Sequence, residues 1–100
     1  MKALDVVTFG EAMAMFMANH PGSLDEVSQF TRELAGAETN VAIGLARLGF
    51  GSGWASKVGS DAFGRFIINR LKNENVNINH VLLDNRYPTG FQLKSMVLDG

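Results

Sequence analysis

Short segments with the apolar pattern of β-strands alternate along this 100-residue chain with two segments of helical periodicity. The strand patterns occupy 4–9, 12–18, 27–34, 52–58, 80–84 and 91–98. The helical patterns occupy 39–48 and 61–73. Because a helix between two strands normally forms a right-handed crossover between parallel strands, this order predicts an α/β fold with a mainly parallel sheet.

The first helical segment, 39–48, is apolar on nearly all sides, and Arg47 is its sole charge. Val41, Leu45 and Leu48 lie on one of its faces, with Ala42 and Ala46 beside them, and a helix this apolar is expected to be covered on most sides. Gly49 suits the left-handed conformation that often follows a helix end. The segment 61–73 has a narrower apolar face, made of Phe63, Phe66, Ile67 and Leu71, with Arg65 and Lys72 outside it.

The composition excludes several classes of protein. Apolar residues make up 46% and charged residues 19%, which argues against disorder, and nine Lys and Arg nearly balance ten Asp and Glu. Without a basic run we expect no nucleic-acid or membrane partner. The absence of cysteine excludes disulfides and thiolate metal sites, and neither His20 nor His80 has the neighbours of a metal ligand. A cytoplasmic protein is expected.

Two glycine patterns come close to nucleotide-binding motifs. Gly49, Gly51 and Gly53 are spaced as in a dinucleotide-binding turn, but there a strand precedes and a helix follows, the reverse of the order here. The spacing from Gly59 to Gly64 matches a phosphate-binding loop, but the required Lys-Ser/Thr does not follow. We interpret 57–64 as the start of the helix 61–73, with Asp61 in its first turn.

The stretch AGAETN, at 35–40, has two interpretations. Gly36 lets a ligand approach the backbone, the helix start offers free N–H groups, and the Asn40 amide can both donate and accept, as a pair of sugar hydroxyls requires. Alternatively, the stretch is a flexible turn before a helix that Thr39 or Asn40 caps. The residues alone leave both open.

Together these stretches resemble the ribokinase (PfkB) family of carbohydrate kinases along the whole chain. The family's first signature, a glycine-rich turn and an asparagine leading into an apolar helix, reads AGAETNVAIGLARLG at 35–49. Its next block, a strand followed by G-x-D-x-x-G, reads KVGSDAFG at 57–64. The resemblance implies a ribokinase-like sandwich with a β-strand lid. Since the pattern ends on the turn signal Asp99-Gly100, we expect 1–100 to be the N-terminal segment of one kinase domain.

Within the family the chain looks most like the 2-keto-3-deoxygluconate kinases, which share GEA after the first strand, GAE-x-N in the signature and TGFQLKS in a later strand. Kinases for neutral sugars commonly carry an aspartate five residues after the first-strand glycine, where this chain has Met15. Because an aspartate would repel a substrate carboxylate, its absence fits a sugar acid, although it fits another binding geometry equally.

The resemblance also implies a sugar pocket and a lid. Its substrate-binding residues would be Gly36, Ala37, Glu38, Thr39, Asn40, Gln92 and Lys94. Strands at about 12–18, 27–34 and 89–98 would form a lid that covers the substrate and, in relatives, pairs subunits, so a homo-oligomer is expected. Lys94 either attracts a carboxylate or is a solvated charge on the lid.

The implied reaction is ATP-dependent phosphorylation of 2-keto-3-deoxygluconate to its 6-phosphate, with magnesium. The family's catalytic aspartate and ATP pocket belong to a later glycine-rich motif that these residues do not contain, so we expect no catalytic residue here and no turnover by this segment alone. The alternatives are a fructokinase- or ribokinase-like kinase, and a sugar-binding or oligomerisation module without activity.

Overall fold

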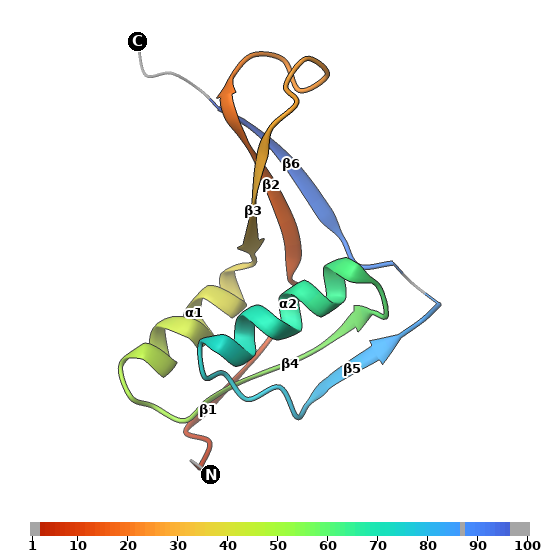
Figure 1. The fold of residues 1–100 in the computed structure, drawn as a ribbon. Coiled ribbons are helices and arrows are strands. Elements are labelled where there is room, and N and C mark those ends of the chain that lie inside the picture. The colour runs from red at the N-terminus through yellow and green to blue at the C-terminus, as the bar shows by residue number, and fades with distance from the viewer. Residues whose placement is uncertain (1–2, 87, 97–100) are drawn as a thin grey trace.

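The computed structural model describes residues 3–86 and 88–96. The elements are, in chain order, β1 (Val6–Phe9), β2 (Met13–Pro21), β3 (Phe30–Ala35), α1 (Ala37–Arg47), β4 (Ser52–Gly59), α2 (Ala62–Asn73), β5 (Val81–Asp84) and β6 (Phe91–Met96) (Figure 1). The predicted end of the last strand at 97–98 and the predicted turn at Asp99-Gly100 lie outside the described residues.

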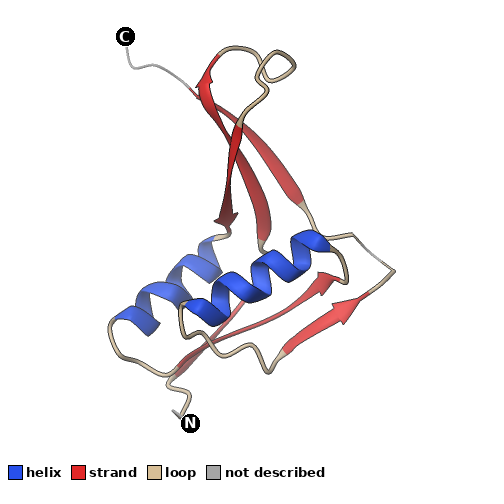
Figure 2. Cartoon of the chain, viewed as in Figure 1, coloured by secondary structure: helices blue, strands red, loops and turns tan. Residues whose placement is uncertain are grey.

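The first sheet is wholly parallel and confirms the predicted α/β class. Its strand order is β1-β4-β5, with Val6 opposite Ser52 and Ser56 opposite Val81. Both helices lie side by side on one face of this sheet (Figure 2). The carboxyl ends of β1, β4 and β5 consequently meet at one edge of the sheet.

The second sheet contains the three segments predicted as lid strands, and we call it the lid sheet. Its order is β3-β2-β6, with β2 antiparallel to β3 and parallel to β6. Figure 1 shows it projecting away from the helices and the first sheet.

The bounds of the lid strands differ from the prediction in all three strands. The strand predicted at 12–18 is longer in the structure, because β2 continues to Pro21 and the chain turns at Gly22, whose φ is 140°. In the pairing of β2 with β6 the register shifts between Met17 and Pro21. The shift accommodates Pro21, which has no backbone N–H to donate. Segment 27–29 is not part of β3, which begins at Phe30, and segment 89–90 is not part of β6, which begins at Phe91.

The core lies between the first sheet and the two helices. Trp54, Ile67 and Leu71 are fully buried there. The apolar face predicted for α2 is confirmed, since Arg65 and Lys72 are exposed. On the lid side of α2, the centroid of the Phe63 ring lies 5.5 Å from the ring centroids of Phe16 and of Phe91. Phe63 thus joins the lid sheet to the core.

The prediction that the first helix is covered on most sides was wrong in part. Its buried residues are Thr39, Ala42 and Ile43, whereas Val41 is 52% and Leu48 is 76% exposed. The small Ala42 side chain lets α1 approach β4 closely enough for the Ser52 hydroxyl to donate to the Ala42 carbonyl at 2.8 Å. The helix therefore packs through Thr39, Ala42 and Ile43, whereas Val41 and Leu48 face away from the core and Leu45 is half-buried. The prediction for Gly49 is confirmed by its φ of 98°.

Candidate functional site

A cleft of about 370 Å³ opens at the carboxyl edge of the parallel sheet, beside the base of the lid sheet. Open α/β sheets usually bind ligands at this edge. The cleft is lined by Glu11, Ala12 and Met13 before and within β2, by Lys57, Val58 and Gly59 of β4, by Asp84 of β5, and by Pro88, Thr89 and Gly90 before β6. The cleft thus collects residues from four separate parts of the chain.

The start of α1 lies against this cleft through Gly36. A β-carbon on Gly36 would come within 2.8 Å of the Glu11 carbonyl oxygen and 2.9 Å of the Thr39 hydroxyl, and the φ of Gly36 is 142°. Both the space and the conformation require glycine at this position. The backbone of the signature turn is thereby held against the segment that lines the cleft.

The capping interpretation of the signature turn was wrong. The helix begins at Ala37, and Thr39 lies inside its first turn, fully buried, with its hydroxyl donating to the Gly36 carbonyl at 2.9 Å. Within the described residues no side chain caps α1. The first-turn N–H groups of α1 consequently lack the side-chain acceptor that α2 has in Asp61.

Glu38 fixes the same turn against the end of β1. Its backbone carbonyl accepts a hydrogen bond from the Thr8 hydroxyl at 3.0 Å. Its side chain covers Gly10 so closely that a β-carbon there would lie 2.6 Å from the Glu38 Cδ atom. Ala37, Glu38 and Asn40 are exposed. The predicted pocket residues of the signature thus present backbone and polar side chains beside the carboxyl end of β1.

The two predicted lid residues lie farther up β6. Gln92 is opposite Met15 and Lys94 is opposite Met17 in the parallel pairing of β2 and β6, and both are exposed. Since alternate residues of a strand share a face, they lie on the face of Met13, which lines the cleft. Gln92 and Lys94 themselves are not among the residues that line it.

A hydrogen-bonded junction closes the cleft toward α2. Asp61 accepts from the backbone N–H of Gly64 and from that of Thr89, both at 2.8 Å, and the Thr89 hydroxyl accepts from the N–H of Gly59 at 2.8 Å. The two bonds to its carboxylate lower the pKa of Asp61, with the bond from the Thr89 backbone as the largest cause. The predicted helix start at Asp61 is confirmed, and the same carboxylate also anchors the segment before β6.

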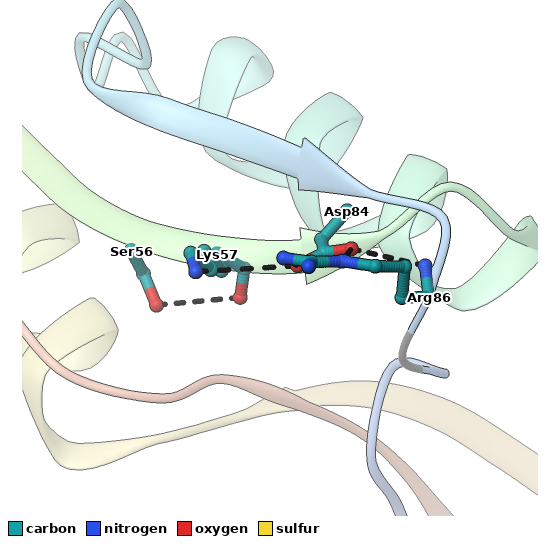
Figure 3. Close-up of polar contacts among 4 residues, drawn as sticks. All are labelled: Ser56, Lys57, Asp84 and Arg86. Atoms are coloured by element: carbon teal, nitrogen blue, oxygen red, sulfur yellow. Dashed lines mark hydrogen bonds and ion pairs between the residues drawn. The ribbon is translucent and has the colours of Figure 1, made fainter.

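A charged cluster lies where β4 and β5 end (Figure 3). The Asp84 carboxylate accepts from the backbone N–H of Arg86 at 2.9 Å and from its guanidinium at 3.1 Å, while the Lys57 ammonium is 4.0 Å away. The Arg86 guanidinium is the main cause that lowers the pKa of Asp84. Asp84 is therefore an anion held in place between two cations beside the cleft.

Sequence reasoning did not select Glu11, Lys57, Asp84 or Thr89 as site residues. Glu11 belongs to the quoted GEA and Thr89 to the turn before β6, so two motifs could have indicated them, whereas Lys57 and Asp84 meet only by folding. In 3–86 and 88–96 no group of three His, Asp or Glu side chains could hold a metal ion. None of the helices in these ranges is long and apolar enough to cross a membrane.

A parallel sheet covered by helices, with a cleft at its carboxyl edge and a second sheet projecting beside it, is an architecture suited to small-molecule enzymes. The model of the pfkB family carbohydrate kinases matches residues 3–97. The chain therefore belongs to this family, as its resemblance to the ribokinase (PfkB) family implied.

Curated relatives of two substrate types are similar to the chain. It is 58% identical over 98 residues to 2-dehydro-3-deoxygluconokinase of Bacillus subtilis (strain 168), covering 97% of this chain and 30% of that protein. It is 38% identical over 96 residues to Fructokinase-2 of Zea mays, covering 95% of this chain and 29% of that protein. The chain thus spans about a third of the length of the relatives that it matches.

Solved structures confirm the ribokinase-like fold. A PfkB protein from Polaromonas sp. JS666 superposes with a TM-score of 0.94 at 51% identity, covering 98% of this chain and 33% of that one. An uncharacterized sugar kinase from Pyrococcus horikoshii, in complex with ATP, superposes with a TM-score of 0.80 at 36% identity, covering 86% and 30%. The lid sheet is part of the superposed fold, because these matches extend over most of the chain.

Proposed function

We propose that this chain supplies the sugar-binding part of a cytoplasmic kinase that transfers the γ-phosphoryl group of ATP to the sugar acid 2-keto-3-deoxygluconate, giving its 6-phosphate. It would be the N-terminal segment of one kinase domain, with the lid sheet covering the substrate. The 58% identity to 2-dehydro-3-deoxygluconokinase supports this substrate.

The contrast between the two helix starts carries the proposal. In α2 the Asp61 carboxylate caps the first turn, whereas in α1 no described side chain does so and Gly36 holds the turn against the cleft. Free N–H groups at a helix start attract hydroxyl and carboxylate oxygens. We therefore assign the backbone of Gly36 and Ala37, and the amide of Asn40, to substrate hydroxyls.

Glu38 and Thr39 would support that turn in different ways. The exposed Glu38 carboxylate can accept from a sugar hydroxyl. Thr39 acts through Gly36, since its buried hydroxyl already donates to the Gly36 carbonyl.

On the lid face that includes Met13, the surroundings of Met15 favour a carboxylated substrate. Met15 offers no negative charge there, Gln92 beside it can donate to an oxygen, and Lys94 is one step along the same face. Glu33 is opposite Met15 in the pairing with β3 and so lies on the same face. Because its negative charge would repel the substrate carboxylate, the carboxylate would have to bind away from Glu33. Lys94 would attract the sugar acid, while Met15 avoids the repulsion that an aspartate would cause.

ATP and magnesium would be bound by parts of the protein beyond this chain, together with the base that removes the proton of the attacking hydroxyl. Phosphoryl transfer depends mostly on positioning and charge stabilisation. The task of the described residues is therefore to bind and orient the sugar and to exclude water beneath the lid.

The test is a coupled kinase assay of the complete protein with 2-keto-3-deoxygluconate, fructose and ribose. We expect kcat/KM for the sugar acid to exceed that for either neutral sugar by orders of magnitude. Met15→Asp should reduce the preference for the acid, whereas Met15→Leu should retain it. Comparable kcat/KM for fructose would instead support a fructokinase-like enzyme, which the similarity to Fructokinase-2 makes the second candidate.

We also propose that the lid sheet forms a contact between two copies of the protein. In the described residues β3 and β6 are its edge strands, with unpaired backbone groups on their outer sides. Phe91 and Leu93 on β6 are 58% and 47% exposed, which adds apolar surface at one of these edges. Sedimentation of the complete protein with Leu93→Lys should show a lighter species than the wild type.

A further inference from the structure

A second cavity, of about 380 Å³, lies between the base of the lid sheet and the outer side of α2. Arg32 of β3 is opposite Phe16 in the strand pairing, and Phe16 packs on Phe63 of α2. Since Met13, which lines the cleft, points to the opposite face of the lid sheet, this cavity is separate from the candidate sugar site.

The cavity collects positively charged and amide side chains. Arg65, Asn69 and Asn73 are spaced four residues apart and so form one stripe along α2, with Arg70 beside them. Arg32 reaches them from β3. The three arginines therefore converge on one hollow from two different layers of the fold.

Arg32 is oriented by an aromatic ring. Its guanidinium carbon lies 4.1 Å from the centroid of the Phe66 ring. A stacked guanidinium contacts the ring with its face, and its N–H groups donate in the plane of that face. The contact with the ring thus positions the guanidinium without using its hydrogen-bond donors.

Negative charge near the cavity is scarce. None of its lining residues within the described ranges is Asp or Glu. Glu74, which accepts from Arg70 at 2.6 Å, is shared with Arg47 at 2.6 and 2.7 Å. The Arg65 guanidinium is one of the smaller causes that lower the pKa of Asp61, but Asp61 does not line the cavity. Glu33 lies on the other face of β3, so the described lining of the hollow carries three arginines and no acid.

We propose that this cavity binds a phosphorylated small molecule, with its phosphate between Arg32 and Arg65. Guanidinium groups bind phosphate oxygens in pairs of parallel hydrogen bonds, more strongly than neutral donors do. The volume exceeds that of one phosphate group, and Asn69 and Asn73 can bind hydroxyls of the remainder. Because Arg32 belongs to the lid sheet and Arg65 to α2, the bound anion links the two layers.

Calorimetric titration of the complete protein with inorganic phosphate, and then with pyrophosphate, tests the site. A saturating non-hydrolysable ATP analogue keeps the nucleotide site occupied, and low ionic strength limits screening. We expect one phosphate per chain. Arg65→Ala should raise its Kd roughly tenfold or more, since a hydrogen bond to a charged group is lost. Lys72→Ala, which removes an exposed charge of the same helix outside the cavity, should leave the Kd unchanged.

Arg32→Leu provides the second variant, because leucine retains apolar contact with Phe66 but has no charge. Thermal melting without phosphate checks that each variant is folded. The proposal is overturned if neither probe binds, if folded Arg65→Ala and Arg32→Leu bind phosphate as the wild type does, or if Lys72→Ala weakens binding as much as they do. The readout is binding, so it holds whatever sugar the enzyme phosphorylates.

Discussion

The carboxylate of Asp61 accepts a hydrogen bond from the backbone N–H of Thr89 at 2.8 Å, across 28 residues of sequence. Its other oxygen accepts from the N–H of Gly64 at 2.8 Å and caps α2. One side chain thus fixes both the start of a core helix and the point where the chain leaves the core for the lid strand β6.

Replacing this side chain should separate its two roles. Asp61→Ala removes the helix cap and the bond to Thr89, so unfolding free energy should fall by about 1–2 kcal/mol for the cap and about 1 kcal/mol for the second bond. Asp61→Asn has one carbonyl oxygen, so it should retain the cap and lose the bond to Thr89. Urea denaturation at pH 7 measures both losses, with Ser60→Ala, an exposed neighbour, as the control. Equal stability of Asp61→Ala and wild type would contradict the assigned role.

A second prediction concerns the pH dependence of stability. Hydrogen bonds from Arg47 and then Arg70 lower the pKa of Glu74 from 4.5 to about 2. A group with a lowered pKa stabilises the folded state above its unfolded pKa, and this contribution is lost as the pH falls through the folded pKa. Between about pH 4.5 and 2, stability should therefore fall less steeply in Glu74→Gln than in the wild type.

Thermal melting over this pH range at two salt concentrations provides the measurement. Because the Arg47 side chain is 62% exposed, high salt should reduce the difference between the two proteins. Glu26→Gln, at an exposed position outside this network, should follow the wild-type curve. A Glu74→Gln curve parallel to the wild type at low salt would show that the network does not contribute.

A third prediction tests the signature turn. Asn40→Ala in the complete enzyme should remove one or two hydrogen bonds to the sugar, at a cost of about 1–3 kcal/mol. That corresponds to a loss of roughly 5- to 150-fold in kcat/KM for the sugar, with the KM for ATP nearly unchanged. Asn85→Ala, at another exposed asparagine, is the matched control. Unchanged sugar KM and kcat would remove Asn40 from the proposed site.

A fourth prediction concerns the 100-residue chain expressed alone. Leu48, directly after α1, is 76% exposed, and Leu82 and Leu83 on β5, at the edge of the first sheet, are 61% and 60% exposed. Exposed apolar side chains and open strand edges favour association, so sedimentation should detect oligomers or aggregates. Leu82→Lys should reduce this association. No ATP turnover with 2-keto-3-deoxygluconate is expected, and a monodisperse wild-type monomer would contradict the prediction.

Much of the fold could be predicted because it depends on local chemistry. The apolar face of 61–73, the acid at Asp61 and the positive φ of Gly49 follow from helix geometry, which acts within one or two turns. The motifs at 35–49 and 57–64 indicated the family, which the match over 3–97 confirms. The roles assigned to Gly36 and Asn40 stay predictions that the kinetic tests address.

Tertiary structure decided which face of α1 is buried and which residues share the cleft. Val41 and Leu48 are as apolar as any core residue, yet Ala42 faces β4, because a close approach of helix and strand needs a small side chain. Lys57 and Asp84 lie 4.0 Å apart only because β4 and β5 pair in parallel and end at the same edge. Sequence patterns report the periodicity of one segment, whereas such contacts depend on how two distant segments pack, and no local signal specifies that.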